Sequence, residues 1–421
     1  MKKILNDISE KGFFHLFSAN SLIHLIEFGS QFFVAWILLA EDVGRIKSFQ
    51  SFAALAVLFA GIGFNTSILK LCSEKETTLL EKQTLFSAAI KITLAFSLLT
   101  LIGIFLLSHF QLISNDSLTN KLFVYYALSV PLIALNNLIV AYYQALKAFK
   151  KVSLLLVVAR VVHVAVIVSL TYFYGLNGFV LGIVIGFLLS TILLFSKVDF
   201  LKGWKKVTAV HYQKNWQLAR FAFLANSVGM ITLYLDIFIL NHIIKDAEEF
   251  GYYGFALTLI AGLRIVTATT QQFVTPFFSE FSSNYKQSIK AFKKANRLFI
   301  LIIFLLGLAA FITVPFLLPF FDGGKYNGSA FFFQILTIAW AIRSIPSLKG
   351  PFLLAYGYMN VNFYNALIIL FISAFPCWYL IDNYGIQGAA YAQLFTAIVF
   401  FIVVSGNFAR IMRKIGLKNQ P

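Results

Sequence analysis

Apolar runs long enough to cross a bilayer alternate with short polar segments along the whole chain. A helix needs about 20 mainly apolar residues to span the hydrocarbon core. The pattern predicts an all-α polytopic membrane protein with twelve transmembrane helices, at residues 17–40, 49–70, 85–109, 122–146, 152–174, 177–197, 219–243, 251–279, 297–320, 330–356, 361–381 and 386–408.

Three short sequence elements occur twice, in the same order and about half a chain apart. Tyr-Gly-Leu-Asn-Gly at Tyr174 to Gly178 returns as Tyr-Gly-Ile-Gln-Gly at Tyr384 to Gly388. The other pairs are Ala19-Asn20-Ser21 with Ala225-Asn226-Ser227, and Glu41-Asp42-Val43-Gly44 with Glu248-Glu249-Phe250-Gly251. Because the offsets are all 206 to 210 residues, we infer a duplication. It predicts two like-oriented six-helix bundles, residues 1–210 and 211–421, around a central cavity, a plan typical of secondary transporters.

Composition supports a membrane protein and explains the charge. Hydrophobic residues make up 59% of the chain and charged residues 12%, a balance that soluble domains do not show. Most of the 34 Lys and Arg residues lie in the N-terminus, the C-terminal tail and the connections on one side. The opposite connections hold only Arg45, Lys47, Lys121, Lys245 and Lys325. The positive-inside rule therefore places both termini in the cytoplasm, and the net charge of +17 requires no nucleic-acid partner.

The connections leave little room for chemistry outside the membrane. Those predicted on the outer side are short, and the longest connection, residues 198–218, is a basic linker between the repeats. Cys72 and Cys377 are isolated and lack the spacing of a disulfide framework or a metal site. We therefore expect no enzyme activity, no cofactor and no metal.

Polar residues form a stripe on the first predicted span. Asn20, His24, Glu27 and Gln31 recur every three or four residues, so they share one helical face. A charged side chain facing lipid at the bilayer centre costs at least about 2.5 kcal/mol. The stripe must therefore face another helix, with its side chains joined by hydrogen bonds, or line a wet cavity. Glu27 is the most informative residue of the stripe, because burial and the nearby His24 act on its carboxyl group in opposite directions.

Three arginines lie deep inside predicted spans, where a guanidinium cannot lose its charge. They are Arg160, with His163 one turn away, Arg264, with Gln271 on the same stripe, and Arg343. Each either faces a cavity or forms a structural ion pair with Glu27 or Asp236.

Lys91 and Asp236 lie nearer to span ends. The Lys91 side chain is long enough to reach the headgroups, and Asp236 is either interfacial or part of the buried set. Counted together, the deep cations outnumber the deep carboxylates, so we expect a positive cavity and an anionic cargo.

The tenth span contains Pro346, Gly350 and Pro351, which break the backbone hydrogen-bond ladder. This segment is either a simple kink or a flexible joint that moves during transport.

Several segments of the chain carry a family resemblance. They are Ala40-Glu41-Asp42-Val43-Gly44 after the first span, the close of the second span from Gly61 to Lys70, the run from Ala134 to Lys151, and the Tyr-Gly-Leu-Asn-Gly motif. In these the chain resembles the polysaccharide transporter family, the O-antigen-type flippases, of the multidrug/oligosaccharidyl-lipid/polysaccharide exporter superfamily. Arg45-Ile46-Lys47 departs from the family pattern, in which an aromatic-rich stretch is more usual.

The resemblance implies a flippase of the bacterial cytoplasmic (inner) membrane that serves lipopolysaccharide or other surface polysaccharide assembly. Its cargo would be a polyprenyl-diphosphate-linked oligosaccharide, moved from the cytoplasmic to the outer leaflet by alternating access with H⁺ or Na⁺ as coupling ion. We expect a monomer surrounded by membrane lipids. The predicted substrate-binding residues are Arg160, Arg264, Arg343, Lys91, Asn20 and Gln271, and the predicted coupling residues are Glu27, His24 and Asp236.

Two other functions compete with this interpretation. Multidrug exporters of the same superfamily share the fold, but a cationic drug would favour a cavity rich in carboxylates. A membrane-embedded glycan polymerase or ligase would need a sizeable outer loop, which this chain lacks.

Overall fold

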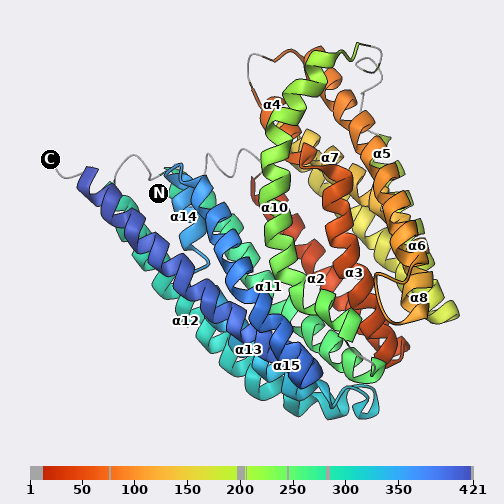
Figure 1. Ribbon diagram of the computed structural model, residues 1–421. Helices are drawn as coiled ribbons and strands as arrows, with labels where there is room; N and C mark the ends of the chain where they lie inside the picture. The colour runs from red at the N-terminus through yellow and green to blue at the C-terminus, as the bar shows by residue number, and fades with distance from the viewer. Residues whose placement is uncertain are drawn as a thin grey trace. The chain divides into compact units, whose positions relative to one another are not determined.

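The computed structural model describes residues 13–74, 77–196, 204, 206–243, 246–280 and 285–418. All regular structure within them is helical (Figure 1), which confirms the predicted all-α class. The helices are α2 (Phe13–Ile37), α3 (Ala40–Gly61), α4 (Phe64–Leu71), α5 (Leu79–His109), α6 (Ser117–Ala127), α7 (Ser129–Ala145), α8 (Phe149–Phe195), α10 (Ala209–Ile243), α11 (Ala247–Glu280), α12 (Tyr285–Leu317), α13 (Ser329–Ser344), α14 (Lys349–Ala355) and α15 (Met359–Lys418), with short 3-10 helices η2 (Leu318–Phe320) and η3 (Asp322–Gly324).

Eight helices in the described residues are long and apolar enough to cross a membrane, and α6 with α7, bent by 41°, makes a ninth span. Two of the eight, in α8 and α15, are interrupted by glycines with non-helical backbone angles. The apolar part of α8 has 44 residues, about 66 Å at 1.5 Å per residue, which is twice the ~30 Å core. Each of these two helices therefore supplies two spans. With the shorter apolar helix Ser21–Ile37, the count is consistent with the predicted twelve.

Contacts along the chain divide it into two compact units. Unit 1 consists of Met1–Leu38 and Ser48–Met230, and unit 2 of Leu39–Lys47 and Ile231–Pro421. The start of α3 thus belongs to unit 2, and the start of α10 belongs to unit 1. The predicted repeat boundary at residues 210 and 211 describes a duplication, which contacts do not test, and it stays a prediction.

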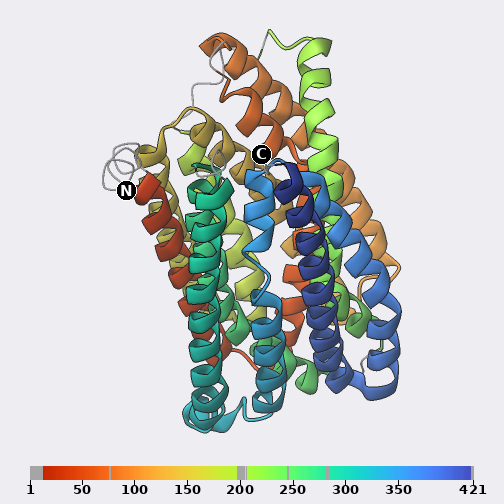
Figure 2. The same cartoon turned by 90° about the vertical axis from the view of Figure 1, so that its left-hand side faces the viewer.

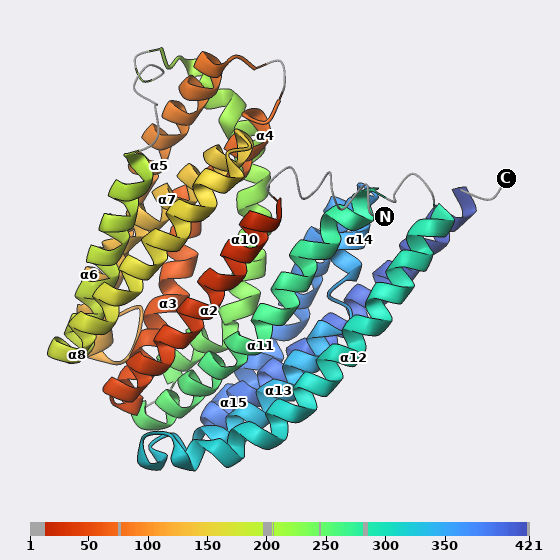
Figure 3. The same ribbon diagram turned by 180° about the vertical axis from the view of Figure 1, so that it is seen from behind.

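In unit 1, α2 packs along α8 (Figure 3), and α7 packs against α4, α5 and α8. Buried aromatic side chains fill the space between α5 and α7, where the rings of Phe86 and Tyr142 stack with centroids 4.2 Å apart. Phe64 and Ile68 of α4 are fully buried in the same cluster. Burying one such side chain contributes about 1.5–3 kcal/mol in water; inside a bilayer the close packing of the rings takes over this role.

In unit 2, α13 packs against α11, α12 and α15, and these helices run side by side (Figure 2). Phe352 of α14 lies at the end of this group, with its ring centroid 4.7 Å from that of Phe292 and 5.4 Å from that of Phe278. Near the other end, Phe255 stacks on Tyr326 at 4.0 Å. Aromatic contacts therefore hold both ends of the group.

The duplicated Tyr-Gly motif forms the same backbone turn in both halves. Gly175 has φ 56° and ψ −138°, and Gly385 has φ 58° and ψ −134°, a conformation that only glycine adopts readily. A Cβ on Gly178 would lie 1.9 Å from the carbonyl oxygen of Leu170, and one on Gly388 would be equally close to a leucine carbonyl. Both glycines of each motif are thus needed to fold an apolar run back on itself, which supports the inferred duplication.

The duplicated acidic motif begins a helix in both halves. Each copy places two carboxylates in the first turn, of α3 and of α11, where they interact favourably with the helix dipole. The glycines that end the two copies meet within unit 2. A Cβ on Gly44 would lie 3.0 Å from the backbone nitrogen of Gly251, and one on Gly251 would lie 2.0 Å from the carbonyl oxygen of Ala40. Both glycines are therefore required for this close helix crossing.

The prediction of a span at residues 49–70 is wrong in its boundaries. α3 already begins at Ala40 and ends at Gly61, because Ile62 (φ 40°) and Gly63 (φ 73°) take left-handed conformations. A Cβ on Gly63 would lie 2.6 Å from the carbonyl oxygen of Ala219, so glycine there allows α10 to approach.

Arg45 and Lys47, predicted in an outer connection, therefore lie on α3. Arg45 forms ion pairs one turn back along the helix, at 2.8 Å with Asp42 and 3.3 Å with Glu41. These pairs allow the polar start of α3 to be helical.

The predicted linker 198–218 is wrong in its second half, because α10 begins at Ala209. Asn215 is buried there: its side chain accepts a hydrogen bond from Ser67 at 2.9 Å and donates one to the Leu85 carbonyl at 3.1 Å. This packing within unit 1 favours helix where composition predicted a loop. Lys202 and Lys205 lie outside the described residues.

The break in the tenth predicted span is confirmed. α13 ends at Ser344 and α14 begins at Lys349, on either side of Pro346. Movement at this break stays a prediction.

We expect Gly178→Ala and Gly388→Ala each to destabilise the protein by about 1–3 kcal/mol, because the added methyl forces the hairpin backbone apart. Gly406→Ala is the matched control, since a Cβ there meets nothing within 4 Å. The measurement is the thermal unfolding midpoint in detergent. A wild-type midpoint for Gly388→Ala would contradict the required close approach.

Candidate functional site

A cavity of about 340 Å³ in unit 2 brings together three of the predicted substrate-binding residues, Arg264 and Gln271 of α11 and Arg343 of α13. Further polar groups line it from α11, from the end of α13 and from α15. These are Thr267, Ser344, Ser347 and Gln393.

Hydrogen bonds tie the polar lining together. The Gln271 amide donates to the carbonyl of Ser347 at 3.0 Å, and the hydroxyls of Thr267 and Ser344 lie 3.2 Å apart. Ser347 belongs to the break between α13 and α14, and its carbonyl accepts this side-chain hydrogen bond. The break therefore contributes to the wall of the cavity.

The cavity is positively charged. Among the residues that the structure describes, no carboxylate oxygen lies within 4.0 Å of Arg264 or Arg343. The Arg343 guanidinium lies 4.9 Å from the ring centroid of Phe400, a cation–π contact. Lys47 of α3, also in unit 2, is buried and interacts electrostatically with Arg264. The arrangement suits an anion that hydrogen-bonds to guanidinium groups.

Asp236 of α10 lies beside this cavity rather than in its lining. Its side chain is 2% exposed, accepts a hydrogen bond from the Tyr253 hydroxyl, and interacts with Gln393 and Arg264. The carboxylate is thus held by neighbours that also contact the cationic cavity.

A second cluster lies in unit 1, where α2 packs on α8. Arg160 Nη1 lies 2.6 Å from Glu27 Oε1, and His24 Nδ1 lies 3.5 Å from Glu27 Oε2. Both features that were open for Arg160 are present: it forms the ion pair with Glu27 and it faces a cavity. Arg160 also lines a cavity of about 260 Å³ with Asn136, Asn137 and Ser190 as the other polar groups.

Two predicted substrate-binding residues lie in neither set. Lys91 Nζ donates to the carbonyl of Trp204 at 3.0 Å and lies 4.6 Å from the centroid of its ring. Asn20 is on α2, but its side chain falls outside the described part of the chain.

Sequence reasoning missed Lys47, Ser347 and Gln393. Lys47 was hidden because the polar start of α3 resembles a loop. Ser347 follows Pro346. A helix break in an apolar span exposes backbone groups, and this could have indicated Ser347. Gln393 is an isolated amide in the last predicted span, and that isolation was the signal for it.

Solved structures with the same fold are transporters of the MOP superfamily. An inward-facing multidrug resistance MATE family transporter aligns with TM-score 0.75 and 11% identity, over 94% of this chain and 96% of that one. Lipid II flippase MurJ in an inward closed conformation aligns with TM-score 0.74 and 17% identity, over 96% and 93%. A MOP superfamily transporter from Pyrococcus furiosus, described by the reverse polarity of its binding pocket, aligns with TM-score 0.67 and 13% identity, over 96% of both chains. This chain is thus a multi-pass membrane protein with the MOP-superfamily fold.

Sequence comparison gives the family. Residues 9–282, more than half of the chain, match the family described as polysaccharide biosynthesis protein, and the chain belongs to it. The resemblance inferred from the motifs is thereby confirmed. A membrane protein of Methanocaldococcus jannaschii described as uncharacterized is 24% identical over 401 residues, which cover 91% of this chain and 94% of that one.

We expect Glu27 and Arg160 to be coupled in stability. Glu27→Gln and Arg160→Gln should each lower the unfolding midpoint, and the double variant should lose less than the sum of both, with a coupling energy of about 0.5–3 kcal/mol. The control is the exposed pair Lys214–Glu81, 3.1 Å apart, which should couple by less than about 1 kcal/mol. Additive losses for Glu27 and Arg160 would show that the ion pair is not structural.

Proposed function

We propose that this protein moves a polyprenyl-diphosphate-linked oligosaccharide from the cytoplasmic to the outer leaflet of a bacterial cytoplasmic membrane. The observation that carries the proposal is the cavity of unit 2, where Arg264 and Arg343 have no carboxylate within 4.0 Å. A guanidinium at bilayer depth needs an anion or water. The diphosphate of the cargo supplies that anion.

The chemistry of the lining supports this cargo. Guanidinium groups bind phosphate through paired, charge-assisted hydrogen bonds, and the Thr267, Ser344 and Gln393 side chains offer hydrogen bonds to adjoining sugar hydroxyls. A cavity of about 340 Å³ lies at the lower end of the range for small-molecule sites. It therefore suits the charged head of the cargo and not a whole oligosaccharide.

The family assignment supports a role in polysaccharide biosynthesis, and the Pyrococcus furiosus neighbour is a transporter of this fold whose pocket has reversed polarity. In our proposal the transport proceeds by alternating access, with both termini in the cytoplasm and the protein acting as a monomer. The second candidate, a multidrug exporter, is favoured by the likeness to the MATE family transporter. A cationic drug would be repelled by Arg264 and Arg343.

Within this proposal, Glu27 with His24, and Asp236, are the groups that exchange the coupling H⁺ or Na⁺. Glu27 is about one-third exposed in its pair with Arg160, so a cation from water reaches it. Binding of that cation competes with Arg160 for the carboxylate, which links occupancy of the site to the packing of α2 on α8.

We expect Arg264→Ala and Arg343→Ala each to reduce surface glycan to less than about a tenth of the wild-type level, at unchanged membrane abundance. Arg264→Lys and Arg343→Lys should restore part of it, because Lys keeps the charge but lacks the planar guanidinium that forms two parallel hydrogen bonds. Surface-polysaccharide staining with quantified membrane protein is the measurement. The control is Arg413→Ala on the exposed end of α15, which should export normally. Normal staining in both cavity variants would exclude the cargo assignment, and a gain in drug sensitivity instead would favour the exporter.

We expect Glu27→Gln to slow transport per folded molecule and to flatten its dependence on pH or Na⁺, because the amide keeps hydrogen bonds but binds no cation. Transport by purified protein in vesicles, at several pH values with and without Na⁺, measures this. An unchanged rate and an unchanged ion dependence would remove Glu27 from coupling.

A further inference from the structure

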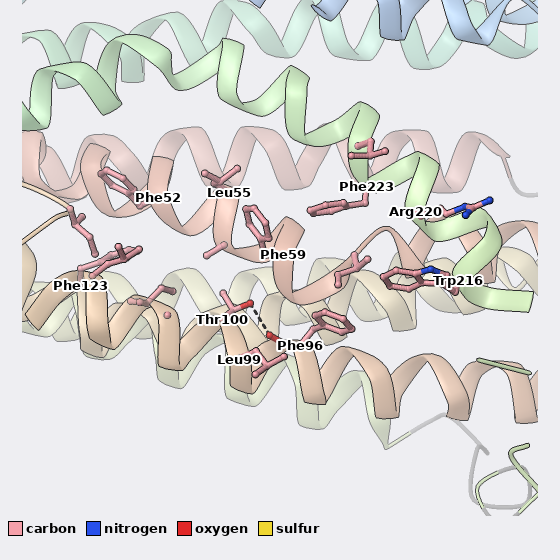
Figure 4. Close-up of a pocket in the computed structure, with 17 residues that line it drawn as sticks. Phe52, Leu55, Phe59, Phe96, Leu99, Thr100, Phe123, Trp216, Arg220 and Phe223 are labelled. Atoms are coloured by element: carbon pink, nitrogen blue, oxygen red, sulfur yellow. Dashed lines mark hydrogen bonds between the residues drawn. The ribbon is translucent and has the colours of Figure 1, made fainter. Parts of the chain in front are cut away.

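Unit 1 contains a second, larger cavity with a different chemistry. It is an apolar groove of about 680 Å³ between α3, α5, α6 and α10 (Figure 4). Thr100 and Arg220 are the only polar side chains among its lining residues, apart from the indole of Trp216. The Thr100 hydroxyl donates to the Phe96 carbonyl at 2.7 Å, so its hydrogen is already bonded within α5. The interior therefore suits hydrocarbon.

One end of the groove is cationic. Arg220 and Trp216 lie at that end, and Phe52 and Phe123 lie at the other (Figure 4). Arg220 is exposed, and among the described residues no carboxylate oxygen lies within 4.0 Å of it. Its guanidinium carbon lies 4.8 Å from the ring centroid of Phe221, a cation–π contact. The groove thus fits a molecule with a long apolar chain and one anionic end.

The length of the groove decides between kinds of lipid. Along α5 it extends from Phe96 to Leu107, about 17 Å at 1.5 Å per residue. α5 has 31 residues, and the 20 that end at His109 cover a ~30 Å core, whereas its first turns are polar. Phe96 then lies about 9 Å into the core and Leu107 about 26 Å, so the groove passes the midplane at about 15 Å.

An ordinary phospholipid fits this geometry poorly. With its phosphate on the side of Arg220, its acyl chains end near the midplane and would leave the part of the groove near Leu107 empty. A polyprenyl chain is longer than one leaflet and fills the groove from end to end. Six aromatic side chains line the groove (Phe52, Phe59, Phe96, Phe123, Trp216 and Phe223), and they offer contacts to the branched methyl groups and double bonds of such a chain.

We propose that the groove of unit 1 is a docking subsite for the polyprenyl chain of the cargo lipid, with Arg220 at its phosphate end. This inference rests on the proposed function and extends it, because it assigns the chain and the transported head to different sites.

Gly103 of α5 gives a direct test. It lines the groove, and a Cβ there meets nothing within 4 Å, so Gly103→Trp places an indole in the groove without a clash at the Cβ. Gly406→Trp on α15, equally free of neighbours, is the matched control. Leu99→Trp, at a lining residue that is 60% exposed, fills the groove from another position if the first variant unfolds.

The experiment measures binding of long-chain polyprenyl phosphate, geranyl phosphate and phosphatidylglycerol to purified full-length protein by native mass spectrometry. We expect Gly103→Trp and Leu99→Trp to weaken the long-chain phosphate at least tenfold and to leave geranyl phosphate unchanged, whereas Arg220→Gln weakens both several-fold. Gly406→Trp should bind as wild type does.

Three outcomes would overturn the proposal: no binding of polyprenyl phosphate to the wild type, wild-type binding by both groove variants, or equal competition from phosphatidylglycerol. The last would make the groove a general lipid site. Failure of the proposed function is distinguishable, because it appears as normal glycan export by Arg264→Ala and Arg343→Ala whatever the groove binds.

Discussion

A charged side chain inside a bilayer must form an ion pair, contact water or bind a charged ligand. This constraint explains where most of the buried polar residues of the protein lie. At bilayer depth a guanidinium facing lipid is costly and cannot be relieved by losing its proton. Arg160 meets the constraint with Glu27 at 2.6 Å. Arg264 and Arg343 line a cavity and are without a carboxylate within 4.0 Å in the described residues. The same residue type is therefore ion-paired in unit 1, whereas in unit 2 we propose that it binds an anion.

The cavity of unit 2 and the groove of unit 1 differ in polarity. Around Arg264 the Thr267 and Ser344 hydroxyls lie 3.2 Å apart and the Gln271 amide donates to the Ser347 carbonyl at the break after α13, so internal hydrogen bonds order part of the polar lining. In the groove of unit 1 the single hydroxyl, on Thr100, is satisfied within its own helix. In our proposals the first site recognises a charged head, and the second accommodates an apolar chain beside Arg220.

The sequence predicted the span pattern, the duplication and the deep arginines, because hydrophobic length and isolated charges are local signals. It failed where packing overrides composition. The start of α3 is polar, yet ion pairs of Arg45 with Asp42 and Glu41 stabilise it as helix. The basic linker becomes the start of α10 because Asn215 forms hydrogen bonds with Ser67 and Leu85. Residues that are distant in sequence, such as Lys47 and Arg264, are brought together only by folding. The cation Lys47 near Arg264 and the groove beside Arg220 were therefore not predictable from the sequence.

The crossing of Gly44 and Gly251 has a consequence for how the two halves change over time. After a duplication, the copies of a motif usually diverge independently, since each occupies its own surroundings. Here a side chain on Gly44 would meet the backbone of Gly251, and one on Gly251 would meet the backbone at Ala40. No change at one glycine makes room for a change at the other, because both are already at the smallest size. The two copies of the motif therefore form one structural element here, and neither glycine can be replaced independently of the other.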